Sequence, residues 1–120
     1  MPKVLYAEDE PTIAAMVRDY LAVKAPEFQL EVVPDGRTCL QRMGAGGIDV
    51  LLVDLVLPDI DGLQIITELA ARGDATPAVM ISSHGQNALA VQALRAGAVD
   101  CIDKSTSQVL EVGTILRHVH

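Results

Sequence analysis

The feature that most constrains the fold is an alternation, repeated five times, between a short apolar run and a segment with helical periodicity. Each apolar run is about 4–6 residues long, a length typical of β-strands. The expected strands are Lys3–Ala7, Phe28–Val33, Val50–Asp54, Ala78–Ser82 and Asp100–Asp103. Strands that alternate with helices predict an α/β fold, in which helices cover both faces of a parallel sheet. We therefore expect a doubly wound, five-stranded parallel sheet with five helices.

The segments between the apolar runs carry signals for where helices begin and end. Apolar residues recur three or four positions apart, and glycines or capping residues flank the segments. The expected helices are Pro11–Lys24, a second capped by Asp35 and ending near Met43, Leu63–Arg72, Gln86–Arg95, and a fifth capped by Ser105 or Ser107. Gly73 and Gly97 follow the third and fourth of these helices. The helices therefore fill the gaps between the expected strands.

Composition limits the class of protein. A length of 120 residues suits one domain, which we assign to residues 1–120. The net charge of −7 and the lack of a Lys/Arg cluster argue against direct binding to nucleic acid. No apolar run approaches the roughly 18 residues of a membrane span, so a cytoplasmic location without membrane attachment is expected. Cys39 and Cys101 are too far apart in sequence to suggest a zinc site or a disulfide framework.

Three acidic residues fall at the ends of two expected strands. Glu8 and Asp9 directly follow the first strand, and Asp54 is the last residue of the third. Open parallel sheets bind ligands beyond the carboxyl ends of their strands, so these side chains are expected at one rim. Three carboxylates placed together repel one another unless a cation or a proton lies among them. A site with only oxygen ligands favours a hard cation such as Mg²⁺.

Two further strands bring other groups to the same rim. Ser82 or Ser83 ends the fourth strand with a hydroxyl, and Lys104 follows the fifth strand with a flexible ammonium group. An ammonium acts as a point charge that suits a phosphoryl oxygen. His84 also lies close enough in sequence to reach the rim, although an exposed loop position is at least as consistent with the sequence.

Four motifs, in order and spanning almost the whole chain, resemble the receiver domain of bacterial two-component response regulators. They are "VLYAEDEP", "LLVDLVLPDIDGL", "PAVMISS" and "AGAVDCIDKS". The resemblance implies a flavodoxin-like sheet with strand order 2-1-3-4-5. It also implies that a sensor histidine kinase or a histidine phosphotransfer protein is the partner.

The resemblance assigns a role to each residue at the rim. Asp54 would accept a phosphoryl group from a phosphohistidine. Asp9, Asp54 and the backbone carbonyl of Val56 would bind Mg²⁺ directly, and Glu8 would act mainly through a bound water. Ser82 would form a hydrogen bond to the phosphoryl group, and Lys104 would pair with it. Aspartates in the "PDIDGL" segment are instead expected to cap helices and turns.

The resemblance also implies a switch surface on the fourth helix, fifth strand and fifth helix, roughly residues 84–120. A partner or a second copy of the chain, as a homodimer, would bind there. Glu8 stands where a second aspartate is usual, and Cys101 where a tyrosine or phenylalanine is usual. Because a thiol has no ring to move inward, the switch is expected to depend on Ser82, with Cys101 as a small buried hydrophobe.

Two other functions remain open from the sequence. A Mg²⁺-dependent phosphatase with an aspartyl nucleophile would need a second acid two residues after Asp54, and Val56 occupies that position. A degenerate receiver used only for docking or dimerisation is the second alternative. We expect no enzyme activity beyond self-phosphorylation and slow self-dephosphorylation. The chain would be a stand-alone regulator or a receiver cut from a longer protein.

Overall fold

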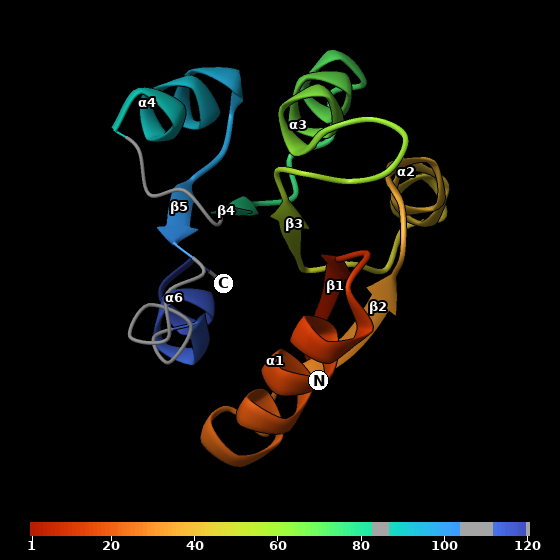
Figure 1. Ribbon diagram of the computed structural model, residues 1–120. Helices are drawn as coiled ribbons and strands as arrows, with labels where there is room; N and C mark the ends of the chain where they lie inside the picture. The colour runs from red at the N-terminus through yellow and green to blue at the C-terminus, as the bar shows by residue number, and fades with distance from the viewer. Residues whose placement is uncertain (83–86, 104–111, 120) are drawn as a thin grey trace.

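The computed structural model describes residues 1–82, 87–103 and 112–119. Within these ranges, five parallel strands form one sheet in the order β2-β1-β3-β4-β5 (Figure 1). The strands are β1 (Lys3–Ala7), β2 (Gln29–Val33), β3 (Val50–Asp54), β4 (Ala78–Ser82) and β5 (Asp100–Asp103). The predicted fold class and strand order are confirmed. Only the start of β2 differs, because Phe28 belongs to the preceding turn, where its N–H donates to Ala25.

Five helices connect or follow the strands in the described part of the chain. They are α1 (Pro11–Lys24), α2 (Gly36–Gly44), α3 (Gly62–Ala71), α4 (Asn87–Ala96) and α6 (Val112–Val119). Asp35 caps α2 as predicted, since its carboxylate accepts a hydrogen bond of 2.7 Å from the N–H of Thr38. The predicted helix start at Gln86 and the cap at Ser105 or Ser107 lie outside the described residues.

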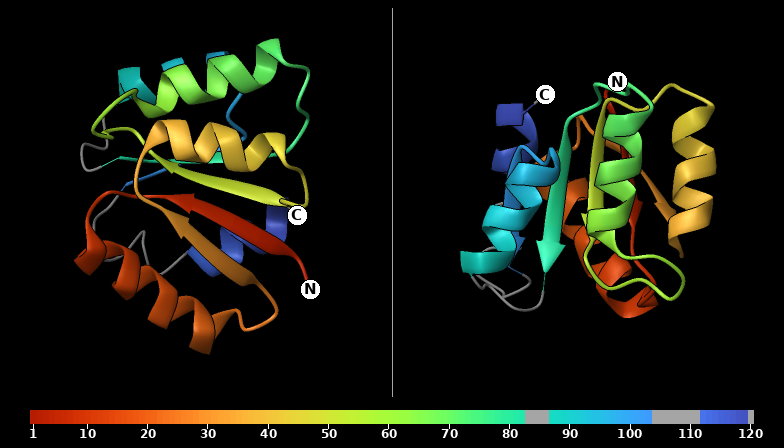
Figure 2. Two further views of the ribbon diagram at one scale, coloured as in Figure 1. Left: turned by 90° about the vertical axis from the view of Figure 1, so that its right-hand side faces the viewer. Right: turned by 90° about the horizontal axis from the view of Figure 1, so that it is seen from above.

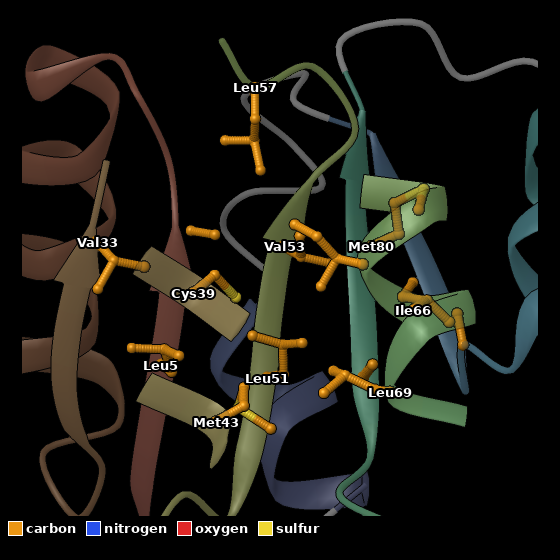
Figure 3. Close-up of a cluster of buried hydrophobic side chains, with 14 of the residues drawn as sticks. Leu5, Val33, Cys39, Met43, Leu51, Val53, Leu57, Ile66, Leu69 and Met80 are labelled. Carbon is orange, nitrogen blue, oxygen red and sulfur yellow. The ribbon is translucent and has the colours of Figure 1, made fainter. Parts of the chain in front are cut away.

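The helices cover the sheet on both faces, which gives the molecule three layers (Figure 2). On one face, α1 and α6 pack on a buried cluster of aliphatic residues with Tyr6 and Phe28. On the other face, side chains of α2, α3 and α4 pack on the sheet; Figure 3 shows the α2 and α3 part of this cluster, which includes Cys39, Met43, Ile66 and Leu69. Strands β1, β3 and β4 are buried on both faces, which explains their continuous apolar sequences.

Helix α6 is held against the C-terminal end of α1. The Arg117 guanidinium pairs with the Glu27 carboxylate and also donates a hydrogen bond of 2.8 Å to the carbonyl of Lys24. The hydrogen bond from Arg117 lowers the pKa of Glu27 to about 2. Gly113 lies against the same end of α1, where a Cβ at this position would meet the Ala25 methyl at 3.2 Å. These contacts anchor α6 on the face of the sheet that α1 covers.

Candidate functional site

The parallel register of the sheet brings three carboxylates together. Ala7 of β1 pairs with Val53 of β3, so the residues that follow them in sequence leave the sheet at the same edge. One carboxylate oxygen from each of Glu8, Asp9 and Asp54 lies within 4.8 Å of the other two. The two strands are central in the sheet, so this cluster lies at the carboxyl-end rim where ligands bind in such folds.

The three acids differ in their exposure to solvent. Glu8 and Asp54 keep only 2% and 3% of their accessible surface, whereas Asp9 is exposed. Burial of two carboxylates beside a third is unfavourable unless positive charge or hydrogen bonds compensate. The donor set contains only oxygen, so the cluster fits a hard divalent cation such as Mg²⁺.

The remaining residues predicted for the site fall in different places. Ser82 is the last residue of β4, next to the strand that carries Asp54, and it is buried. Val56 is 62% exposed, and its N–H lies 3.4 Å from the Asp54 carboxylate. Lys104, Ser83 and His84 lie outside the described residues.

Cys101 differs from the prediction. Its side chain is only partly buried, on β5, where it packs against the cluster beneath α2, α3 and α4. The prediction of a small buried hydrophobe is therefore correct in the packing of Cys101 against the core and wrong in its degree of burial. Edge position explains this: β5 is the last strand of the sheet and has a neighbouring strand on one side only.

The loop after β3 is tied to α2 through Asp59. The Asp59 carboxylate accepts hydrogen bonds from the N–H groups of Gly36 (2.8 Å), Arg37 (2.9 Å) and Ile60 (2.8 Å). Asp61, two residues later, forms a capping box with Gln64 at the start of α3. The predicted capping and turn roles of these aspartates are confirmed, and the contact with α2 links the loop beside Asp54 to a second helix.

The Asp59 contacts predict a pH dependence of stability. Desolvation of the Asp59 carboxyl opposes ionisation, but the hydrogen bonds from Gly36, Ile60 and Arg37 outweigh it and lower its pKa. A carboxyl with a lowered pKa stabilises the fold above its unfolded-state pKa of about 3.9, and this contribution is lost as pH falls through the lower folded-state pKa. In urea unfolding, the stability advantage of wild type over Asp59→Asn should be constant above about pH 5 and shrink at lower pH. An advantage that stays unchanged down to pH 3 would contradict this role.

Gly62 makes a close approach to the backbone of the predicted phosphoacceptor. A Cβ at Gly62 would lie 2.6 Å from the carbonyl oxygen of Asp54 and 3.1 Å from the Cα of Leu55. The Gly62 N–H also donates a hydrogen bond of 2.8 Å to the Leu55 carbonyl. Only glycine permits this contact, which fixes the start of α3 against the end of β3.

We expect Gly62→Ala to destabilise the protein because the new methyl meets backbone atoms that cannot move aside. The loss should be about 1–3 kcal/mol in the free energy of unfolding, the range for overpacking. Gly44→Ala is a matched control, since Gly44 also lies in a helix but a Cβ there meets nothing within 4 Å. Urea unfolding should show Gly44→Ala as stable as wild type or up to about 1 kcal/mol more stable. Equal stability of both variants would refute the close approach.

Tyr6 contacts the acidic cluster and was not among the residues predicted for the site. This residue is fully buried in β1, and its hydroxyl donates toward the Glu8 carboxylate over 3.5 Å. Burial, followed by the negative charges of Glu8 and Asp54, raises the pKa of Tyr6. The signal in the sequence was an aromatic residue in an otherwise aliphatic strand, two positions before an acid and therefore on the same face.

Solved structures of response regulators share this architecture. The receiver domain of the Francisella response regulator 1452 superposes with a TM-score of 0.86 at 24% identity and covers 98% of both chains. The Thermotoga maritima response regulator TrrA in complex with Mg²⁺-BeF gives a TM-score of 0.86 at 18% identity over both full chains. At this level of identity the likeness establishes the fold. Within the described ranges, none of the helices combines the length and apolar character needed to cross a lipid bilayer.

Curated proteins match in sequence over most of this chain. The Myxococcus xanthus protein-glutamate methylesterase/protein-glutamine glutaminase 5 is 34% identical over 110 residues, which cover 91% of this chain and 32% of that protein. The Bacillus subtilis transcriptional regulatory protein ResD is 30% identical over 118 residues, which cover 96% of this chain and 48% of ResD. The chain thus spans less than half the length of these relatives. The family model for the response regulator receiver domain matches residues 4–112 of this chain. Together with the fold and the acidic rim, this match shows that the chain belongs to that family of two-component signalling domains.

Proposed function

We propose that this receiver domain accepts a phosphoryl group on Asp54, in a Mg²⁺-dependent reaction, from the phosphohistidine of a sensor histidine kinase or a histidine phosphotransfer protein. One observation carries the proposal: the buried Asp54 ends a central strand with its carboxylate within 4.8 Å of those of Glu8 and Asp9. Family membership supplies the class of chemistry.

The proposed metal site uses residues with two different degrees of exposure. Asp9, Asp54 and the backbone carbonyl of Val56 would hold Mg²⁺ directly, while the buried Glu8 would act mainly through a bound water. Bound Mg²⁺ would neutralise negative charge on the transferring phosphoryl oxygens. A structure of TrrA holds Mg²⁺ with beryllofluoride, which supports this assignment by similarity of fold.

The transfer requires Asp54 as a nucleophile. A carboxylate oxygen of Asp54 attacks the phosphorus, a P–O bond forms, and the P–N bond to the donor imidazole breaks. The imidazole departs with the electron pair of that bond and takes up a proton. The Ser82 hydroxyl, on the strand beside Asp54, would donate a hydrogen bond to the phosphoryl group. Lys104 would pair with the same group and help to hold it in line.

A small phosphodonor such as phosphoramidate, added with Mg²⁺, separates this proposal from the two alternatives. We expect one hydroxylamine-sensitive phosphoryl group per chain and no rapid turnover, because Val56 stands where a phosphatase of this type would need an acid. Rapid release of phosphate would indicate a phosphatase. Neither labelling nor turnover would indicate a degenerate receiver that acts only by docking.

The proposed output surface is formed by α4, β5 and α6. Two residues of α4, Val91 and Leu94, and Val99 in the loop before β5 are exposed apolar residues. A partner or a second copy of the chain, as a homodimer, would bind there. Because Arg117 anchors α6 to the end of α1, we expect the larger change in the α4 part of the surface. A cytoplasmic location is also part of this proposal.

Hydrogen exchange with and without a beryllofluoride phosphoryl mimic tests the switch. Exchange should change within residues 84–120, since the segments that follow Ser82 and Asp103 enter this region and would be drawn toward the phosphoryl group. Ser82→Ala should blunt the change, whereas Cys101→Ala should leave most of it intact. Changes confined to the loops after β1 and β3 would contradict a switch on this surface.

A further inference from the structure

We propose that Tyr6 is a positioning residue for the metal site, and that its hydroxyl holds the Glu8 carboxylate toward Asp9 and Asp54. This inference rests on the proposed Mg²⁺-dependent function and adds a residue to it. The juxtaposition that carries it is a fully buried tyrosine whose hydroxyl lies 3.5 Å from a carboxylate oxygen of Glu8, which is itself buried in the acidic cluster.

The packing of Tyr6 leaves its hydroxyl few alternatives. The ring lies in the buried cluster beneath α1 and α6, whose other buried members are apolar side chains that cannot accept a hydrogen bond. A buried tyrosine hydroxyl normally finds a polar partner, because leaving it without one costs free energy. Among the described residues, Glu8 is the acceptor within reach of this hydroxyl.

The protonation state of Tyr6 suits a permanent donor. The phenol of an unperturbed tyrosine ionises only at about pH 10. Near neutral pH the Tyr6 hydroxyl therefore carries its proton. A neutral donor can orient Glu8 without adding charge to a cluster that already contains three carboxylates.

A hydrogen-bond partner that orients the carboxylate matters more for a glutamate at position 8 than it would for an aspartate. A glutamate side chain has one more rotatable bond, so its carboxylate samples more positions unless a neighbour restricts it. Partners that orient metal-binding groups typically contribute 10- to 100-fold to metal affinity. Glu8 is assigned to act through a bound water, and the separation of 3.5 Å is long for an O–H···O hydrogen bond. The contribution here should therefore fall below that range.

We expect Tyr6→Phe to weaken Mg²⁺ binding by about 3- to 10-fold, measured by calorimetric titration, because it removes the hydroxyl and keeps the ring. The effect should depend on the length of the residue-8 side chain. In a Glu8→Asp background the carboxylate lies roughly 1.5 Å farther from the hydroxyl, and Tyr6→Phe should then change affinity by less than about twofold. A role in packing alone would lower affinity equally in both backgrounds.

Tyrosine fluorescence provides an independent measurement, since the chain has two tyrosines and no tryptophan. Mg²⁺ bound beside Glu8 would change the electric field at its carboxylate, and this should change the emission of a phenol hydrogen-bonded to it. The change should occur in wild type and in the matched control Tyr20→Phe, whose replaced ring belongs to α1. It should shrink in Glu8→Asp and be absent in Tyr6→Phe.

The outcomes separate this inference from the proposed function. No calorimetric binding of Mg²⁺ to wild type would overturn the metal site and the role of Tyr6 together. Normal binding to wild type, with equal affinity in Tyr6→Phe or equal losses in both backgrounds, would overturn the role of Tyr6 and leave the proposed function standing. An unchanged fluorescence response in Tyr6→Phe would likewise overturn it.

Discussion

Asp54→Asn should abolish phosphoryl incorporation from a small phosphodonor in the presence of Mg²⁺. The amide has nearly the same shape as the carboxylate, so packing at the end of β3 should be retained. It lacks the negative charge and nucleophilicity needed to form an acyl phosphate. Removing the nucleophile should therefore lower incorporation to background, whereas wild type gains one phosphoryl group per chain, as measured by intact-protein mass spectrometry.

Asp61→Asn is the matched control for this experiment. Asp61 lies in the same loop and caps α3 through a hydrogen bond of 2.8 Å from the N–H of Gln64. Asparagine serves as an N-cap about as well as aspartate, so the fold around the loop should persist. This variant should be labelled to the wild-type level. Labelling of Asp54→Asn at an unchanged level would show that another residue is the acceptor.

Asp9→Ala should weaken Mg²⁺ binding by about 10-fold or more, and by clearly more than Glu8→Ala does, because Asp9, unlike Glu8, is assigned as a direct ligand. The structure makes the comparison informative, since Asp9 is exposed at the rim while Glu8 is buried beside Tyr6. Calorimetric titration of both variants gives the two affinities. Equal losses, or a larger loss for Glu8→Ala, would mean that the direct and indirect roles are reversed.

Thermal unfolding of the same two variants is the necessary control. Removal of a buried carboxylate relieves repulsion in the cluster and also removes the acceptor of the Tyr6 hydroxyl, so Glu8→Ala alters stability for reasons unrelated to metal. Affinities should therefore be compared at a temperature at which both variants are folded. This separates loss of a ligand from loss of the fold.

Most of the fold was predictable because its signals are local. The bounds of β1, β3, β4 and β5 agree with the apolar runs, since strands buried in a parallel sheet have continuous apolar sequences. Strand β2, whose sequence alternates between polar and apolar residues, lies at the edge of the sheet. Helix α3 begins at Gly62, one residue before the predicted start at Leu63. Asp61 is the N-cap of this helix and forms its capping box, so the first helical residue directly follows it.

Only the part of the site that follows from strand order could be predicted from the sequence. The meeting of Glu8, Asp9 and Asp54 follows from adjacent parallel strands that end at one rim. Contacts between distant segments could not be predicted. In the link between α2 and the loop after β3, Arg37 and Asp59 are 22 residues apart in sequence, so their contact depends on how the loop folds back.

Two other contacts needed three-dimensional structure for a different reason. The approach of Gly62 to the Asp54 carbonyl depends on the angle between β3 and α3, which sequence patterns do not specify. The contact between the Tyr6 hydroxyl and Glu8 depends on side-chain conformation, although their spacing of two residues already places both side chains on the same face of the strand. The partial exposure of Cys101 likewise depends on what covers the edge of the sheet.

The most direct test of the central claim is to identify the atom that carries the phosphoryl group. Wild-type protein would be phosphorylated with phosphoramidate and Mg²⁺ and then treated with borohydride, which reduces an acyl phosphate of aspartate to homoserine. Peptide mapping by tandem mass spectrometry then reads the modified position. We predict homoserine at position 54 and at no other aspartate, with none formed when Mg²⁺ is chelated. Homoserine at another position, or a phosphoryl group on a histidine or serine with residue 54 unmodified, would contradict the account.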